Sequence, residues 1–281
     1  PDVTPGTAPT SGWKEIRYTG ESLAPTQDTT ESAEIVASRE SQGAVRTGVG
    51  GAGGFNVEMH YGTFDDFLAA AFFGAWTGPN VLKVGSVAAS SMSIEKKFGA
   101  LTVPQYQLFA QAYADSFSID IAVKQIMTGG FTFLSKQPVM SGTQTSTLAP
   151  AAINTNPIWN SIDHISAITE GGSPLTGVTK ISLNVANGIR RQDVLGTTAP
   201  FGFAPSKFKV TGSLTCYMQD AALINKFTGF TQSALAFRLG TGAGLLYDFS
   251  IAKMRYTDGK VVAGAGDQDV MVELSFMAQV D

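Results

Sequence analysis

Few residues in the chain could carry acid–base or nucleophilic chemistry. His60 and His164 are the only histidines among the 281 residues, and the sequence has no Gly-x-Ser-x-Gly nucleophile motif near either of them. Triads assemble in space, so residue spacing alone leaves a Ser-His-Asp site open. Serine is nevertheless so frequent here that its proximity to a histidine carries little weight. We therefore favour surface or interface positions for both histidines.

The clustered carboxylates have structural explanations. Asp65 and Asp66, with Glu58 nearby, have the composition of an acid–base pair or a metal site. However, residues 63–73 have a helical pattern, with Thr63 as the expected N-cap and Gly74 as the stop. Acidic residues are favoured in the first turn of a helix by the helix dipole. We therefore interpret the two aspartates as helix-start residues.

Other candidate ligand sets are also weak. Asp267 and Asp269 lack the periodic oxygen ligands of a calcium loop and predict a hairpin turn instead. One cysteine, Cys216, and two histidines do not supply a typical zinc site. Residues 48–53 match the dinucleotide motif G-x-G-x-x-G, but they precede a predicted strand and not a helix, so we interpret them as a flexible or tightly turning loop. We expect no metal, no cofactor and no catalytic residue.

Composition points to assembly. Charged residues make up 15% of the chain, against about 25% in a typical soluble domain. A membrane protein would also be short of charge, but the longest apolar run, residues 67–76, is half of the roughly twenty residues that span a bilayer. The net charge of −4 argues against a protein that grips nucleic acid. The remaining explanation is a chain that buries its uncharged surface against copies of itself.

The chain is predicted to be mainly antiparallel β. Apolar and polar residues alternate with the period of a half-buried strand in six segments: residues 54–61, 92–98, 117–123, 207–218, 247–254 and 270–277. Two segments, 63–73 and 219–227, have helical patterns, and residues 105–114 are a weaker candidate for a third short helix.

The two halves share an order of elements. Gly54 is followed by a strand, a helix ending in Phe72-Phe73-Gly74, and a strand with the sequence Ser-Ile-Glu-Lys at 93–96. Gly212 is followed by the same order, with Phe-Thr-Gly at 227–229 and Ser-Ile-Ala-Lys at 250–253. We interpret this as an internal duplication, although chance agreement between two such units stays open. The expected organisation is an N-terminal arm (1–12), a first unit (13–138), a linker or inserted loop (139–178) and a second unit (179–281).

Motifs in the first unit carry a family resemblance. Residues 13–23 have the sequence Trp-Lys-Glu-Ile-Arg-Tyr-Thr-Gly-Glu-Ser-Leu. Ser-Ala-Glu-Ile follows at 32–35, then Ser-Arg at 38–39, the strand at 54–61, Gly-Thr-Phe-Asp-Asp-Phe-Leu at 62–68 and Trp76. This pattern resembles the major tail tube proteins of long-tailed bacteriophages with flexible, non-contractile tails. Beyond about residue 140 the resemblance rests on general pattern and on the duplication.

The resemblance implies a fold and a function. The fold would be two tandem tail-tube-type β-sandwich or barrel units, each with a flanking α-helix. The chain would be a structural virion protein and not an enzyme, and three chains would form a pseudo-sixfold ring. Stacked rings would form the tube through which double-stranded DNA is ejected without specific binding. The alternative is another tail ring, cap or connector protein that does not elongate.

Further expectations follow from that resemblance. Partners would be other copies of the chain, a tape measure protein inside the tube, and tail terminator and tail tip proteins at its ends, with synthesis in the host bacterial cytoplasm and no membrane insertion. Polar strand faces would line the lumen, and the candidate residues are Asn56, Glu58, His60, Ser118 and Asp120. We expect the polar N-terminal arm to reach across a seam between rings.

Overall fold

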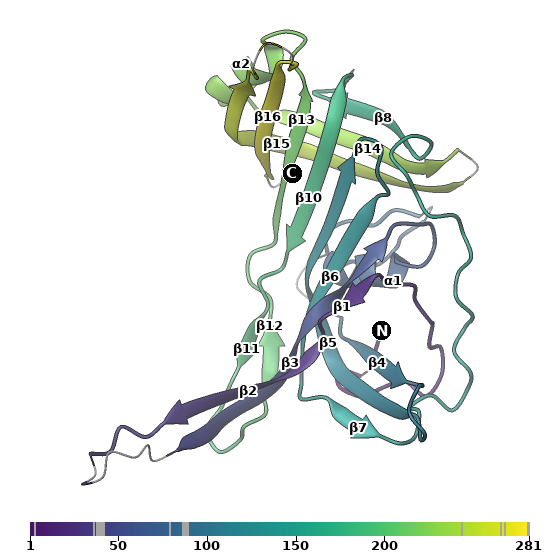
Figure 1. Cartoon of the computed structure of the whole chain (residues 1–281), viewed down its shortest axis with the longest axis vertical. Helices are drawn as coiled ribbons and strands as arrows, with labels where there is room; N and C mark the ends of the chain where they lie inside the picture. The colour runs from purple at the N-terminus through teal and green to yellow at the C-terminus, as the bar shows by residue number, and fades with distance from the viewer. Residues whose placement is uncertain are drawn as a thin grey trace.

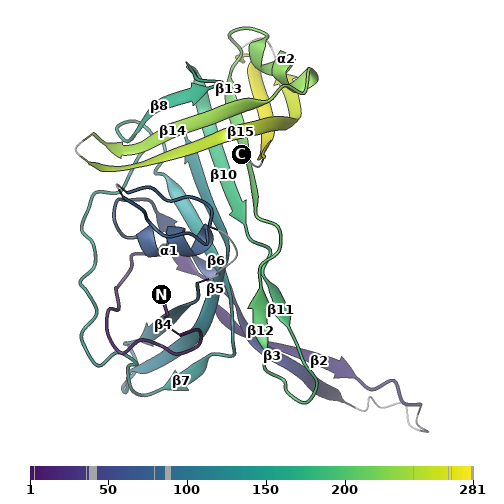
Figure 2. The same cartoon turned by 180° about the vertical axis from the view of Figure 1, so that it is seen from behind.

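The computed structural model describes residues 1–2, 4–35, 37, 43–78, 80–85, 90–242, 244–264, 266 and 268–279. Arg39, Ser38 and Asp267, on which part of the resemblance and of the expected turn rest, lie outside the described residues. The chain is mainly β, with 52% strand and 5% helix, which confirms the predicted class. Its body is elongated, with a hairpin arm projecting from one end (Figures 1 and 2).

Among the described residues, fourteen strands form one large antiparallel sheet, and β11 and β12 form a separate two-stranded sheet. The first half contains β1 (Gly20–Glu21), β2 (Ala24–Glu31), β3 (Ala44–Glu58), α1 (Asp65–Ala71), β4 (Met92–Phe98), β5 (Gln105–Ala122), β6 (Thr128–Ser135) and β7 (Val139–Ser141). The second half contains β8 (Ile165–Glu170), β9 (Ser173–Pro174), β10 (Val178–Ala186), β11 (Arg190–Gln192), β12 (Gly202–Ala204), β13 (Lys209–Tyr217), α2 (Ala222–Thr228), β14 (Ser233–Thr241), β15 (Leu245–Val262) and β16 (Met271–Ala278). The main path is β1-β3-β6-β5-β10-β13-β16-β15-β14-β8-β9, so β5 and β10 join the halves.

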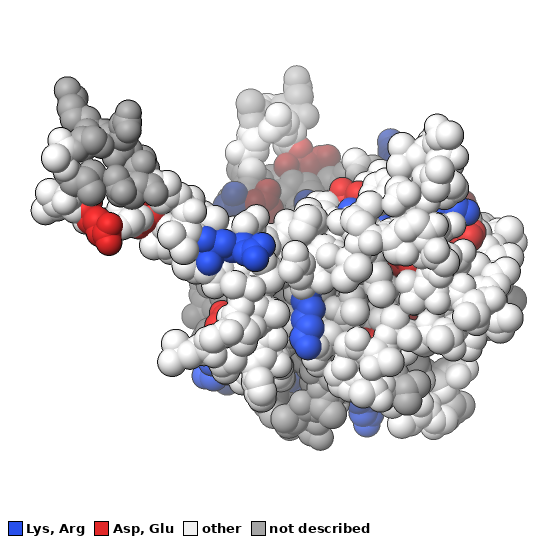
Figure 3. All heavy atoms as spheres, turned by 90° about the horizontal axis from the view of Figure 1, so that it is seen from below, with Lys and Arg blue, Asp and Glu red and all other residues white. Residues whose placement is uncertain are grey.

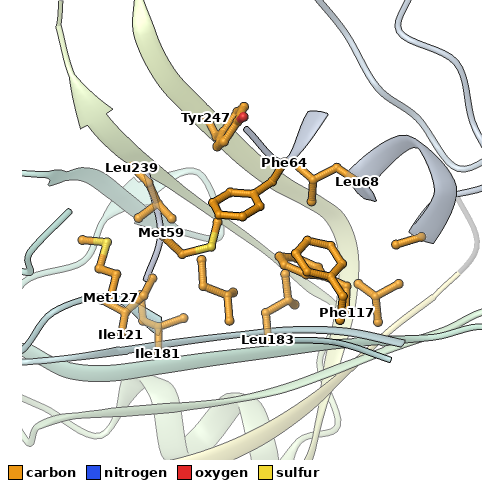
Figure 4. Packing of buried hydrophobic residues seen from close by; sticks show 14 of the residues in the cluster. Met59, Phe64, Leu68, Phe117, Ile121, Met127, Ile181, Leu183, Leu239 and Tyr247 are labelled. Carbon is orange, nitrogen blue, oxygen red and sulfur yellow. The ribbon is translucent and has the colours of Figure 1, made fainter. Parts of the chain in front are cut away.

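One core serves both halves. Because successive side chains in a strand point to opposite faces, the alternating strands place their apolar residues on one side of the sheet. Met59 and Phe64 of the first half lie beside Leu239 and Tyr247 of the second, above Leu183 of β10 (Figure 4). The two halves are therefore packed together as well as hydrogen-bonded.

The order of elements and their pairing repeat along the chain. Strands β2, β3, β4, β5 and β6 pair in the spatial order β2-β3-β6-β5-β4, and β10, β13, β14, β15 and β16 pair as β10-β13-β16-β15-β14. The irregularities in strand register repeat too. The β4–β5 pair has a register shift just after Met92 of β4, and the β14–β15 pair has one just after Ser233 of β14. The β5–β6 pair has a shift just after Ala114 of β5, and the β15–β16 pair has one just after Tyr256 of β15. These shifts identify corresponding residues in the two halves.

The repeat differs from the one expected from the sequence. The Ser-Ile-Glu-Lys segment at 93–96 lies in β4, but Ser-Ile-Ala-Lys at 250–253 lies in β15, which corresponds to β5. That alignment was wrong, because short strands of similar composition can match out of step. The helix ends also correspond differently. Phe73 and Phe230 both follow a helix with positive φ, at 46° and 49°.

Two helix predictions need correction. Residues 105–114 belong to strand β5, which pairs with β4 and β7 over this stretch, so cross-strand pairing overrides the local preference of an Ala- and Gln-containing segment. Helix α1 begins at Asp65, and its N-cap position is Phe64 with no side-chain cap hydrogen bond. Thr63 is therefore not the N-cap, because its hydroxyl bonds to His60 instead.

A hairpin arm projects from the body. It consists of β2 and the first part of β3, and the short β11–β12 hairpin lies beside it (Figure 1). Arg191 Nη1 donates to Asp28 Oδ2 at 3.0 Å, and Val49 N donates to Thr198 O at 2.9 Å. Since β11–β12 lies between β10 and β13, both halves send a hairpin in the same direction.

The N-terminal segment is held by its own chain. The hydroxyls of Ser91 and Ser93 each donate to the Asp2 carboxylate at 2.7 Å. The connecting segment 142–164 runs along the first half, where Ala151 N donates to Trp13 O at 2.8 Å. Within this subunit the described residues of the N-terminal arm, 1–2 and 4–12, therefore pack on the first half, and the expected reach across a ring seam stays a prediction. Strands β7, β8 and β9 lie inside the expected linker 139–178.

Candidate functional site

Four of the predicted lumen residues lie together on one face of the sheet. Asn56 of β3 and Ser118 of β5 are both opposite Gly130 of β6, on either side of it. In the next row, Glu58 and Asp120 are both opposite Thr128. The face that carries these residues is opposite the face that carries the core, because residues two apart along a strand share a face.

The same polar face continues through the second half of the chain. Asp120 pairs with Ser182 of β10, which pairs with Ser213 of β13, then Ser275 of β16 and Asp258 of β15. We call the whole surface the polar sheet face. Its members are Asn56, Glu58, Ser116, Ser118, Asp120, Thr128, Thr132, Lys180, Ser182, Asn184, Thr211, Ser213, Thr215, Asp258, Lys260, Glu273 and Ser275.

Sequence reasoning missed the second half of this surface. Alternation in residues 207–218 and 270–277 was recognised, but their polar positions were not assigned to any face. The pairing of β5 with β10 could not be read from local pattern, and it is what joins the two polar faces. A signal was present in the sequence, since polar residues recur at every second position, at Thr211, Ser213 and Thr215 in the first segment and at Glu273 and Ser275 in the second.

Short hydroxyl side chains dominate the polar sheet face, and several satisfy one another. Ser116 and Thr132 hydroxyls lie 2.6 Å apart, and Ser182 and Ser213 hydroxyls 2.7 Å apart. The charges that are present are mixed in sign, and Lys260 is paired with Glu273 at 2.9 Å. The molecule seen from below is likewise mostly uncharged, with separated acidic and basic groups (Figure 3). Such a surface has no clustered positive charge with which to grip a polyanion.

His60 does not belong to this surface. It is 1% exposed, because β3 ends at Glu58 and the chain turns inward towards α1. Its Nδ1 lies 2.9 Å from Glu58 O and its Nε2 lies 2.7 Å from Thr63 Oγ1. Burial lowers the pKa of His60. The predicted lumen position, and the surface or interface position preferred for this histidine, are both wrong.

The acids at the start of α1 make structural contacts. The Tyr247 hydroxyl donates to Asp65 Oδ1 and accepts from Gly62 N at 3.1 Å, which ties β15 of the second half to the first. Burial and the Asp65 carboxylate raise the pKa of Tyr247. Asp66 pairs with Lys14 at 2.6 Å. Both aspartates therefore have partners that hold elements together.

A buried acid, Glu170, lies in a cleft of about 320 Å³ beside α2. Glu170 accepts hydrogen bonds from Ser233 at 2.6 Å and Tyr256 at 3.2 Å, and Lys226 of α2 pairs with its other oxygen. The carboxylate, already surrounded by donors, anchors α2 to the sheet. Cys216 also lines this cleft, and burial raises the pKa of its thiol, which makes it a weaker nucleophile.

The glycine-rich segment is a strand and not the expected loop. Residues 48–53 lie within β3 and pair with β2 and β6. Glycine is required where another backbone approaches closely. A Cβ at Gly54 would lie 1.9 Å from Phe131 O, and Gly53 has a φ of 122°. No phosphate-binding turn exists here, and the described residues contain no group of three or more side chains suited to a metal ion.

The comparison with protein families identifies the family of the chain. A family model described as "Phage tail tube protein" matches residues 2–278. The chain belongs to the phage tail tube protein family. No match was found among the curated proteins. The family match extends well past residue 140, where the sequence motifs had ended. Among the described residues of this tail tube protein, no helix is long and apolar enough to cross a membrane.

Proposed function

We propose that the chain forms rings of three copies, which stack into the tail tube of a siphovirus-type phage. The observation that carries this proposal is the polar sheet face, which runs without interruption across β3, β6, β5, β10, β13, β16 and β15. Two repeated sheet segments per chain would give six around a ring of three. On this proposal the repeats are two tail tube units, and joining them edge to edge encloses a conduit.

The chemistry of the polar sheet face suits the passage of double-stranded DNA. A conduit must not bind phosphates, and neutral hydroxyls with sign-mixed charges provide few counterion-releasing contacts. On this proposal Asn56, Glu58, Ser118 and Asp120 line the lumen. The tape measure protein would occupy the same lumen before ejection, with terminator and tip proteins at the tube ends. The protein would be made in the host bacterial cytoplasm.

Electron microscopy of the purified protein tests the proposal. We expect filaments with a central channel, and a reconstruction with three chains per ring and the polar sheet face inside. A variant with Ser118→Cys should be protected from a bulky thiol reagent in filaments and reactive in the free subunit. A reconstruction with the polar sheet face outside would contradict the assignment. Single rings that never elongate would favour a cap or connector protein instead.

A further inference from the structure

The seam inside the chain suggests how two chains join. At the inner seam, β10 pairs antiparallel with the end of β5, and seven residue pairs run from Lys180↔Ala122 to Ala186↔Ser116. Strand β15 corresponds to β5, but among the described residues no strand pairs with Asp258–Val262 on the side away from β16. Strand β2 corresponds to β10, and among the described residues no strand pairs with Ala24–Asp28 on the side away from β3. One chain thus has two complementary open edges.

The register of the outer seam follows from the repeated irregularities. Phe133 and Phe276 correspond, since each is the last pair before the same register shift, and they lie opposite Gly53 and Gly212. Ala52, just before Gly53, pairs with Ala24 of β2. Thr211, just before Gly212, pairs with Asn184 of β10. Ala24 therefore corresponds to Asn184.

The partner of Ala24 is found in the same way. Asn184 pairs with Ser118, which lies four residues beyond Ala114. Lys260 lies four residues beyond Tyr256, which corresponds to Ala114. We propose that β2 of one chain pairs antiparallel with the end of β15 of a second copy, with Ala24 opposite Lys260, Leu23 opposite Val261 and Thr26 opposite Asp258. This proposal rests on the proposed function and names the surfaces that join the chains.

Burial supports this assignment. Ile119, at the inner seam, is 0% exposed, whereas Val261, which corresponds to it, is 41% exposed. All eight residues of β2 are exposed, whereas in β10 buried residues alternate with partly or fully exposed ones. An unpaired strand edge with exposed apolar residues favours pairing with another chain. A second copy in the proposed register would cover Val261 as β10 covers Ile119.

A side-chain amide provides an independent sign of the same register. At the inner seam, Asn187 N donates to Asp115 O, and Asn187 Nδ2 donates to Ala114 O at 2.8 Å and Ala71 O at 2.9 Å. Asn187 lies three residues beyond Asn184. Gln27 lies three residues beyond Ala24, so it corresponds to Asn187. In the second copy, the carbonyls of Tyr256 and Thr228 correspond to the two acceptors. A side-chain amide therefore stands at the corresponding position of both seams.

The free subunit covers part of this edge with charge. Leu23 N donates to the Glu21 carboxylate at 3.1 Å, and Lys96 bonds to both Leu23 O and Glu21. At the inner seam the corresponding positions hold Ile181 and Phe237, which are buried. Charged side chains that satisfy an edge backbone reduce unwanted pairing. Glu21 and Lys96 must give up their hydrogen bonds to the Leu23 backbone before Val261 of the neighbouring copy can pair with Leu23.

A disulfide across the seam tests the register. Since the Leu23 backbone points outward, Ala24 and Lys260 form the non-hydrogen-bonded pair, with Cα atoms about 4.5 Å apart, a distance that a disulfide spans. The double variant Ala24→Cys with Lys260→Cys should give covalent dimers and trimers on mild oxidation of assembled protein. Mixing the two single variants should give dimers only. The matched control, Ala24→Cys with Asp258→Cys, is two residues out of register and should crosslink at least tenfold less.

A second measurement does not depend on cysteine. Gln27→Ala should raise the protein concentration needed for assembly roughly tenfold, because the Tyr256 and Thr228 carbonyls at the seam lose their donor. Thr29→Ala, on the same strand beyond its register shift, should change that concentration less than twofold. If wild-type tubes form but the in-register cysteines crosslink no better than the control, or Gln27→Ala assembles normally, the seam is wrong and the proposed function stands. If the wild-type protein stays monomeric at every concentration, both are wrong.

Discussion

Replacing Asn187 with alanine should lower the free energy of unfolding by about 3 kcal/mol. Asn187 is 1% exposed, and its amide donates two hydrogen bonds, at 2.8 and 2.9 Å, to the carbonyls of Ala114 and Ala71. Each bond contributes about 1 kcal/mol, and a buried carbonyl left without a donor adds a desolvation cost. In a chain of this size the loss corresponds to a fall in Tm of about 6–12 °C.

Urea unfolding followed by circular dichroism, below the assembly concentration, measures this effect. Asn184→Ala is the matched control, because Asn184 lies three residues earlier, in β10, but is exposed, and it should change stability by less than about 0.5 kcal/mol. Asn187→Asp keeps the shape and places a carboxylate against two carbonyl oxygens, so it should be worse than alanine. Wild-type stability in Asn187→Ala, or a harmless Asn187→Asp, would refute the role assigned to the amide.

Three more predictions follow from the described contacts. Because burial lowers the pKa of His60 below its unfolded value of about 6.5, its contribution to stability is complete above that pH and is lost as the pH falls; His60→Gln should flatten the pH dependence of the urea midpoint between pH 7 and 5. Tyr247→Phe should cost about 2 kcal/mol in urea unfolding, since Asp65 loses its buried donor, and an unchanged midpoint would contradict that link. Glu21→Gln with Lys96→Met should lower the concentration needed for assembly, as measured by light scattering, because the outer edge loses its charged cover; slower or weaker assembly would argue that the pair supports the seam.

Local alternation predicted most strands but not their partners. The segment 92–98 coincides with β4, because polar and apolar residues alternate there except at Lys96. Residues 105–114, the weaker helix candidate, contain Gln, Leu and Ala, which favour helices, and their pairing with β4 and β7 makes them a strand instead. Their conformation depends on contacts that are distant in sequence, which a local pattern does not contain.

The candidate site could be predicted only in part, because local alternation does not contain contacts that are distant in sequence. Asn56, Glu58, Ser118 and Asp120 were found because each stands on the polar side of an alternating strand. His60 continues that alternation in the sequence, but the strand has already ended, so its side chain enters the core. The join between β5 and β10, which extends the surface to the second half, is invisible without the fold.

The hydroxyl pairs described above affect how the polar sheet face behaves in water. Ser116 bonds to Thr132, and Ser182 bonds to Ser213, so each pair spends a donor and an acceptor within the protein. A hydroxyl whose proton is already shared offers less to a passing phosphate or to an ordered water molecule. In a tube built as proposed, DNA moving through the lumen would meet few groups that hydrogen-bond to it. The wall would therefore offer little resistance to its sliding. Low friction would then arise from hydrogen bonds that the wall makes with itself.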